Sequence, residues 1–220
     1  AGSAFDQFDE FIEVYNRSSG LFSTSSLKLH IVNAAGTADI NTPLTYRGAG
    51  NGGIPAHGFL LIAPAGSTLA ASADATYVTS TALSLVANGA FYISNSAASS
   101  TAVMDRVCWG VHSVMSDCEG GSFSSLIENG QSIERKAFNE STSATMAVGG
   151  THVDMGNSVD TQNNSFDFVT RATSLPQNSI ATIETPSGGS YGGASNQAPN
   201  INAAPVFTAS ASSTFNLVAR

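Results

Sequence analysis

The chain has 220 residues, of which 42% are hydrophobic and only 11% are charged, and its formal net charge is −8. Its 16 acidic side chains outnumber 8 scattered basic ones, which argues against a nucleic-acid partner, because such binding needs clustered lysine and arginine. An anionic membrane surface is disfavoured for the same reason. The length suits one large all-β domain, and no run of 18 apolar residues predicts a membrane span.

Strand patterns dominate the chain. Residues 27–33 alternate apolar and polar side chains, as a half-buried strand does, whereas 58–64 is continuously apolar, as a core strand is. Residues 82–96 predict a hairpin with its turn at Asn88-Gly89. Further strands are expected at 8–16, 102–110, 132–138 and 165–171.

Helical patterns are scarce. The one long candidate, residues 126–138, is interrupted by Gly130, and a Ser/Thr/Ala-rich stretch at 65–81 suits a turn or a short helix. The Gly-rich residues 47–58 predict a long loop and lack the lysine of a phosphate loop. Strands separated by Gly, Asn, Ser and Pro predict an antiparallel β-sandwich or barrel.

The two cysteines, Cys108 and Cys118, are spaced for a disulfide that closes a short loop. Such a bond predicts an oxidising compartment, and the alternative is two buried thiols. The chain begins AGSAFDQ, with small residues first, as a chain does after removal of a signal peptide. These features together predict an extracellular or cell-surface protein.

The C-terminal part of the chain changes in character. Residues 186–213 are rich in Gly, Ser, Asn and Pro, as a linker is, and the strand-like run TFNLVA follows them. A tail with so little side-chain bulk is ordered only when something holds it, so we expect it to lie across its own domain or to pair with a neighbouring molecule. The residues predicted to self-associate are Thr214, Phe215, Asn216, Leu217 and Val218.

An ordered series of segments resembles a known family. The series consists of DEFIEVYN, GGIPAHGFLLIAP, LSLVANGAFYISNS, VMDRVCWG, CEGG, SIERKA and DTQNNSFDFVTRATSLPQNS. Over residues 8–179 the chain resembles the lamin-tail domain family in its secreted bacterial form. The resemblance implies an immunoglobulin-like β-sandwich domain at 1–179 without catalytic activity, and it leaves 180–220 as an extension outside the family pattern.

Catalytic patterns are weak. The sequence GGSYG at 188–192 matches a serine-nucleophile motif, but that motif needs a strand-to-helix turn and no helical pattern follows it. The histidines, His30, His57, His112 and His152, lie in separate segments without the spacing of zinc ligands. We therefore do not expect an enzyme.

Acidic residues cluster near the N-terminus, at Asp9, Glu10 and Glu13. In a strand, Asp9 and Glu13 share one face and Glu10 takes the other, so the cluster does not form a catalytic pair. We expect these side chains to solvate a strand edge or to form ion pairs. The basic candidates for pairing are Arg106, Arg135 and Lys136.

The stretch DTQNNSFDF concentrates oxygen-bearing side chains. Asp160, Gln162 and Asn164 alternate as at the start of an EF-hand loop, and with Asp167 they are the candidate calcium ligands. Ser165 occupies the position where such a loop requires glycine, and family members often carry Asp in place of Gln162. The structural alternative is that these side chains cap turns and that Asp167 pairs with an arginine.

Trp109 directly follows Cys108, and neighbouring strand residues point to opposite faces, so the two side chains cannot enter the same core. Core packing is expected for Trp109, and a stacking platform for sugar is the alternative.

The predicted function is a structural or adhesive extracellular protein, with self-assembly into a filament as its specific form. The alternative is a calcium-dependent module that binds a glycan or a protein; no other cofactor is expected.

Overall fold

The computed structural model describes residues 10–33, 39–42, 44–47, 53–78, 89–94, 103–111, 118–124 and 130–186. The regular secondary structure of these residues is mainly β-strand, with one 3-10 turn and one single-turn α-helix. The elements are β1 (Ile12–Tyr15), β2 (Lys28–Asn33), β3 (Asp39–Thr42), β4 (Leu44–Tyr46), β5 (Phe59–Pro64), η2 (Thr68–Ala71), β6 (Ala75–Tyr77), β7 (Gly89–Ser94), β8 (Val103–Trp109), β9 (Ser132–Arg135), α1 (Asn164–Asp167) and β10 (Phe168–Arg171).

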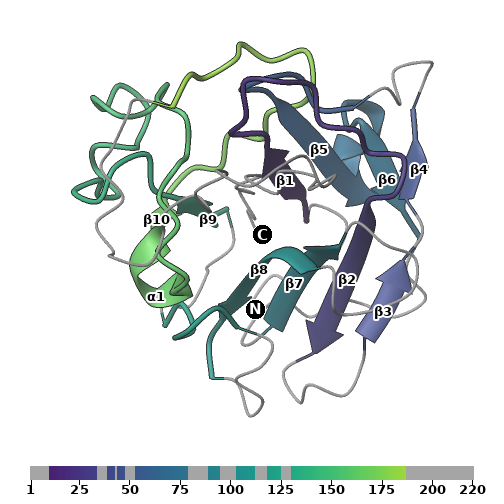
Figure 1. Cartoon of the computed structure of the whole chain (residues 1–220), viewed down its shortest axis with the longest axis horizontal. Helices are drawn as coiled ribbons and strands as arrows, with labels where there is room; N and C mark the ends of the chain where they lie inside the picture. The colour runs from purple at the N-terminus through teal and green to yellow at the C-terminus, as the bar shows by residue number, and fades with distance from the viewer. Residues whose placement is uncertain are drawn as a thin grey trace, which may run out of the picture.

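The strands form two four-stranded sheets and a two-stranded ribbon. The first sheet has the order β1-β5-β6-β4, the second has the order β3-β2-β7-β8, and β10 pairs with β9. Figure 1 shows the two large sheets opposite one another, with β9, β10 and α1 at one side. The predicted all-β, sandwich-like fold is therefore confirmed. One pair departs from the antiparallel expectation, since β5 and β6 run parallel and the connection between them contains η2.

One hydrophobic core lies between the inner faces of the two large sheets. Successive side chains of a strand point to opposite faces, so every second residue enters this core, such as Ile12 and Val14 from β1 and Leu29 and Ile31 from β2. Phe168 of β10 packs on the same cluster, which joins the ribbon to the sandwich. The other buried members are Leu27, Ile54, Leu60, Ile62, Ala75, Tyr77, Phe91, Ile93, Val107, Trp109, Phe123 and Ile133.

The predicted disulfide between Cys108 and Cys118 is confirmed, with a Cα–Cα distance of 5.2 Å. Cys108 belongs to a separate cluster on the outer face of the second sheet, while Trp109 is in the main core. The two neighbours therefore point to opposite faces, as predicted, and Trp109 is 1% exposed. A buried indole offers no surface for sugar stacking.

Gly89 serves a different purpose from the predicted turn. It is the first residue of β7 and pairs with Asn33 and Trp109, and the first arm of the predicted hairpin lies outside the described residues. A Cβ on Gly89 would lie 2.3 Å from Cζ2 of Trp109. Glycine is needed here because the indole packs directly against the backbone.

The expectation that the acidic residues near the N-terminus solvate an edge is wrong for the two that the structure describes. Glu10 is 8% exposed and Glu13 is 2% exposed. Glu13 faces away from the main core, and its Oε2 accepts a hydrogen bond from the backbone N–H of Gln177 at 2.5 Å. Burial raises the pKa of Glu10 to about 8. Asp9 lies outside the described residues.

Residues 176–184 form a strap across the outer side of the first sheet. The hydroxyl of Tyr15 donates to the carbonyl of Glu184, whose N–H donates to the carbonyl of His57 at 2.9 Å. The N–H of Ser179 donates to Asp74 Oδ2 at 2.8 Å. The first part of the predicted extension thus packs on its own domain.

Among the described residues, no helix has the length and apolar character needed to cross a membrane.

Candidate functional site

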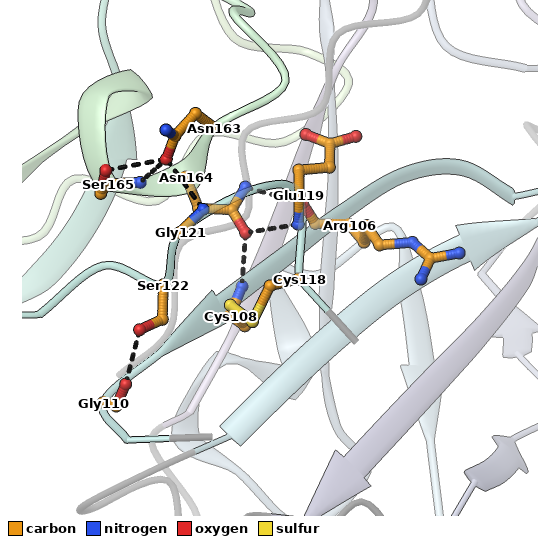
Figure 2. Close-up of a disulfide and its surroundings, with 10 residues drawn as sticks. All are labelled: Arg106, Cys108, Gly110, Cys118, Glu119, Gly121, Ser122, Asn163, Asn164 and Ser165. Atoms are coloured by element: carbon orange, nitrogen blue, oxygen red, sulfur yellow. Dashed lines mark hydrogen bonds between the residues drawn. A yellow bond between two sulfur atoms is a disulfide. The ribbon is translucent and has the colours of Figure 1, made fainter. Parts of the chain in front are cut away.

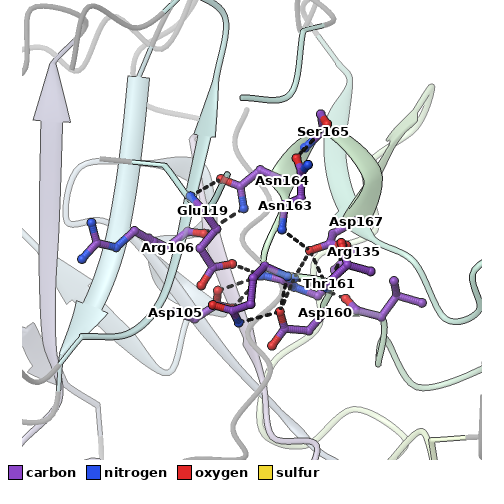
Figure 3. A network of polar contacts seen from close by, with 12 residues as sticks. Asp105, Arg106, Glu119, Arg135, Asp160, Thr161, Asn163, Asn164, Ser165 and Asp167 are labelled. Carbon is purple, nitrogen blue, oxygen red and sulfur yellow. Dashed lines mark hydrogen bonds and ion pairs between the residues drawn. The ribbon is translucent and has the colours of Figure 1, made fainter. Parts of the chain in front are cut away.

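The stretch DTQNNSFDF lies at one end of the sandwich, where it meets β8, β9 and the loop that follows the disulfide (Figure 3). Its neighbours include Asp105 from β8, Glu119 from the loop and Arg135 from β9. Segments far apart in sequence therefore bring several carboxylates to one buried guanidinium. This cluster, Asp105, Glu119, Arg135, Asp160 and Asp167, is called the Arg135 network below.

Arg135 is 0% exposed and lies at the centre of the network. Its Nη2 donates to both oxygens of Asp105, at 2.7 and 2.9 Å, in charge-assisted hydrogen bonds. Its Nη1 donates to Asp167 Oδ2 at 3.1 Å and to the carbonyl of Val159 at 3.2 Å. The guanidinium carbon also lies 4.7 Å from the ring centroid of Phe168. The donors are therefore aimed at several segments at once, as the planar fork of arginine permits.

Two further carboxylates lie just beyond hydrogen-bond distance of Arg135. Glu119 Oε2 is 3.7 Å from Nη2, and Asp160 Oδ1 is 3.8 Å from Nη1. Burial, followed by the charge of Asp105, raises the pKa of Glu119 to about 9. Burial lowers the pKa of Arg135, but the surrounding carboxylates outweigh it and the net direction is upward. Burial and the neighbouring carboxylates thus favour the protonated form of Glu119, and the carboxylates favour the charged form of Arg135.

Asp167 also closes the loop on which it lies. Its carboxylate accepts hydrogen bonds from the N–H of Thr161 at 3.1 Å and from the Thr161 hydroxyl at 2.6 Å. Asn163 caps α1 by accepting from the N–H of Ser165 at 3.1 Å, and it also accepts from the N–H of Gly121 at 3.0 Å. Burial raises the pKa of Asp167, and Arg135 opposes that rise. The structural alternative for Asp167 is therefore realised, including its arginine partner.

Asn164 is fully buried and acts as a substitute for a neighbouring strand. Its Nδ2 donates to the carbonyl of Arg106 at 3.0 Å, and its Oδ1 accepts from the N–H of Cys108 at 3.0 Å and from that of Glu119 at 3.3 Å (Figure 2). The side-chain amide thus pairs with the outer edge of β8 as a peptide group would. It also fixes the loop beside the disulfide.

The four predicted calcium ligands do not converge on one point. Asp160 and Asp167 meet in the Arg135 network, where oxygens of Glu119, Asp160 and Asp167 all lie within 4.8 Å of one another. Gln162 is exposed with φ 59°, and its amide donates to Asp160 Oδ1 at 3.0 Å. The prediction that Asn164 is a calcium ligand is wrong, because its side-chain Oδ1 and Nδ2 are both hydrogen-bonded to backbone groups.

Sequence reasoning named Arg135 only as one of several possible partners and did not name Asp105 or Glu119 as members of a site. Asp105 in the strand-like run VMDRVCW was the available signal, since a charged side chain that is buried in a strand is almost always paired. The motif at 188–192, His112 and the predicted self-association residues lie outside the described residues.

His30 and His152 have local partners, whereas Nδ1 of His57 is buried and has no hydrogen-bond partner among the described residues. His30 Nε2 lies 2.8 Å from Ser94 Oγ, and the ring stacks on Tyr92 with a centroid distance of 4.2 Å. His152 Nδ1 lies 3.0 Å from Ser141 Oγ. These two pairs lie on different elements, β2 with β7 and the loop after β9, so the described histidines do not gather at one site.

Comparison of the chain with protein-family models, with curated proteins and with solved structures gave no match. The resemblance to the lamin-tail domain family therefore stays an interpretation of the sequence. The structure itself defines the class of protein. The chain forms an all-β, sandwich-like domain that is held together by one disulfide and by a buried arginine–carboxylate network.

Proposed function

We propose that this chain is a non-enzymatic secreted or cell-surface structural protein that assembles with copies of itself. The proposal rests mainly on one observation, which is that the polar side chains of DTQNNSFDF form hydrogen bonds within the domain. Asn163, Asn164 and Asp167 direct their side chains into hydrogen bonds that close the domain. Residues that were candidates for chemistry are thus engaged in holding the scaffold together, and the disulfide suits an extracellular location.

The C-terminal segment supports the assembly part of the proposal. The strap holds the chain as far as Glu184 on the outer side of the first sheet, and Thr185 directly after it is exposed. That segment ends in TFNLVA, whose alternating pattern suits a strand that adds to the sheet of another molecule. A head-to-tail contact of this kind does not close on itself and produces a filament.

Deleting residues 206–220 is expected to abolish assembly while leaving the domain folded, because the deleted residues follow the strap. The measurement is light scattering over a concentration series, together with negative-stain imaging of the full chain and the deletion variant. The control replaces the same residues with a Gly/Ser sequence of equal length. Assemblies of unchanged size in both variants would remove the tail as the connector.

A calcium-dependent binding module is the second candidate, and the grouping of Glu119, Asp160 and Asp167 favours it. These oxygens could contribute to the hard oxygen shell that calcium needs. Arg135 lies within 4 Å of each of these side chains, however, and its positive charge opposes a cation there.

Addition of millimolar calcium is therefore expected to leave the thermal midpoint of the domain unchanged relative to EDTA. A ligand that binds only the folded state raises the midpoint by mass action, so a scanning calorimetry comparison decides the matter. Magnesium at equal concentration controls for ionic strength. A rise that is specific to calcium would establish the binding module and count against a purely structural role for the network.

A further inference from the structure

Each large sheet ends in two edge strands, β1 and β4 in the first sheet and β3 and β8 in the second. An edge strand presents unpaired N–H and C=O groups to which a strand of another molecule can add. The described edges of β1, β4 and β8 differ in how their outward groups are satisfied, and among these three the difference identifies one place for such a strand.

The edge of β8 is already occupied. The carbonyl of Arg106 and the N–H of Cys108 are bonded to the amide of Asn164. The carbonyl of Cys108 accepts from Phe123 at 3.0 Å, and the N–H of Gly110 donates to the carbonyl of Phe123 at 2.8 Å. A further strand cannot add along this part of β8 without displacing both segments.

The edge of β1 is covered as well, since its four residues are between 0% and 2% exposed. For β3, the structure describes only the pairing with β2. Within the described part of the chain, β4 differs from both β1 and β8. Leu44 and Tyr46 are half-buried and Thr45 is exposed, so this edge is open to solvent.

The register of β4 shows which of its backbone groups are free. Thr45 pairs with Thr76 of β6, and the N–H of Arg47 donates to the carbonyl of Asp74 at 2.9 Å. Hydrogen-bonding direction alternates along a strand, so the N–H and C=O groups of Leu44 and Tyr46 point away from β6. No described residue bonds these outward groups. Within the part of the chain that the structure describes, two donors and two acceptors therefore face outward from β4 without a backbone partner.

The side chains of β4 add a second requirement. Leu44 and Tyr46 pack against the main core but stay half-exposed, because the first sheet ends beside them. Thr45 points to the opposite face. A strand that fits this edge carries apolar side chains at alternate positions, to continue the core face, and uncharged polar side chains between them.

We infer that the open edge of β4 receives residues 214–218 of a second copy of this chain. Phe215 and Leu217 alternate with Thr214 and Asn216, which matches the requirement of the edge at four of the five positions, Val218 being the exception, and neither segment carries a charge. The stretch from 187 to 213 spans up to roughly 90 Å when extended, which is ample to reach a neighbouring molecule. The inference rests on the proposed self-assembly and names its acceptor surface.

Cysteine cross-linking between two differently tagged full-length chains tests this inference. One chain carries Thr45→Cys and the other carries Asn216→Cys, and the mixture is oxidised gently and resolved without reducing agent. We expect a linked heterodimer in several-fold higher yield than for the control pair, in which Val111→Cys replaces Thr45→Cys. Val111 is 81% exposed and follows β8 of the second sheet. A cysteine at position 111 is therefore accessible, like one at position 45, but it does not lie on the edge of β4.

Equal yields for the two pairs would overturn the inference, as would a single chain with both substitutions that forms only an internal link. A second variant, Thr45→Lys, places a charge on the open edge and is expected to raise the concentration for half-assembly by roughly tenfold without changing the thermal midpoint. If Thr45→Lys assembles normally while deletion of 206–220 abolishes assembly, the edge is wrong and the proposed function stands. If the deletion also leaves assembly unchanged, the proposed function itself fails.

Discussion

Replacement of Arg135 with methionine is expected to lower the free energy of unfolding by about 3–5 kcal/mol, which is a large fraction of the stability of a domain. Methionine fills part of the volume, but the substitution leaves Asp105 and Asp167 buried without their cation. Desolvated carboxylates that lose their partner are much more costly than lost packing alone. Urea unfolding followed by circular dichroism measures the effect.

Lys136→Met provides the matched control. It removes a positive charge from the adjacent residue, which is half-buried, and it is expected to change stability by no more than about 0.5 kcal/mol. The double variant Arg135→Met with Asp105→Asn should be more stable than Arg135→Met alone, because it removes one of the uncompensated charges. If Asp105→Asn destabilises the Arg135→Met background further, charge compensation is not what holds the network together.

Stability is expected to fall as the pH rises from about 5 to 9. Burial raises the pKa of Glu184 to about 7, that of Glu10 to about 8 and that of Glu119 to about 9. In the unfolded chain these groups lose their protons near the ordinary glutamate pKa of about 4.3. Between those values the folded state binds more protons than the unfolded state, so raising the pH favours unfolding.

The decline should be on the order of 2 kcal/mol, since partial hydration of these sites reduces the full penalty. Urea unfolding at a series of pH values at constant ionic strength measures it. Glu119→Gln replaces the carboxyl group with a neutral one of the same shape and should make the decline smaller by the share of Glu119, whereas Glu140→Gln, at an exposed position, should leave it unchanged. Stability that stays constant or rises up to pH 9 would contradict the ionisation states assigned to the network.

The sequence predicted the strands because their patterns are local. Residues 27–33 and 58–64 alternate or run apolar over single segments, and they match β2 and β5. The spacing of Cys108 and Cys118 was also a local pattern, and it predicted the disulfide. Gly89 was misread because its role depends on Trp109, a residue of a neighbouring strand that no local pattern reveals.

The candidate site was predictable only in part. Asp160 and Asp167 were placed together from their spacing, and an arginine partner was anticipated for Asp167. The identity of that partner, and the participation of Asp105 and Glu119, depend on which edges of the sheets meet. Asn164 was assigned to a metal because its amide oxygen resembles a ligand, whereas in the fold that oxygen accepts from the backbone of β8.

The strap has a consequence for how the protein is made. Glu13 and Tyr15 near the start of the chain receive their partners from Gln177 and Glu184, at sequence separations of 164 and 169 residues. A ribosome adds roughly 5–20 residues per second, so β1 waits about ten seconds or more for the segment that covers it. Contacts between such distant residues also slow the folding step itself. The domain therefore stays open at β1 throughout most of the synthesis of the chain, and it closes only when the last described residues have been added.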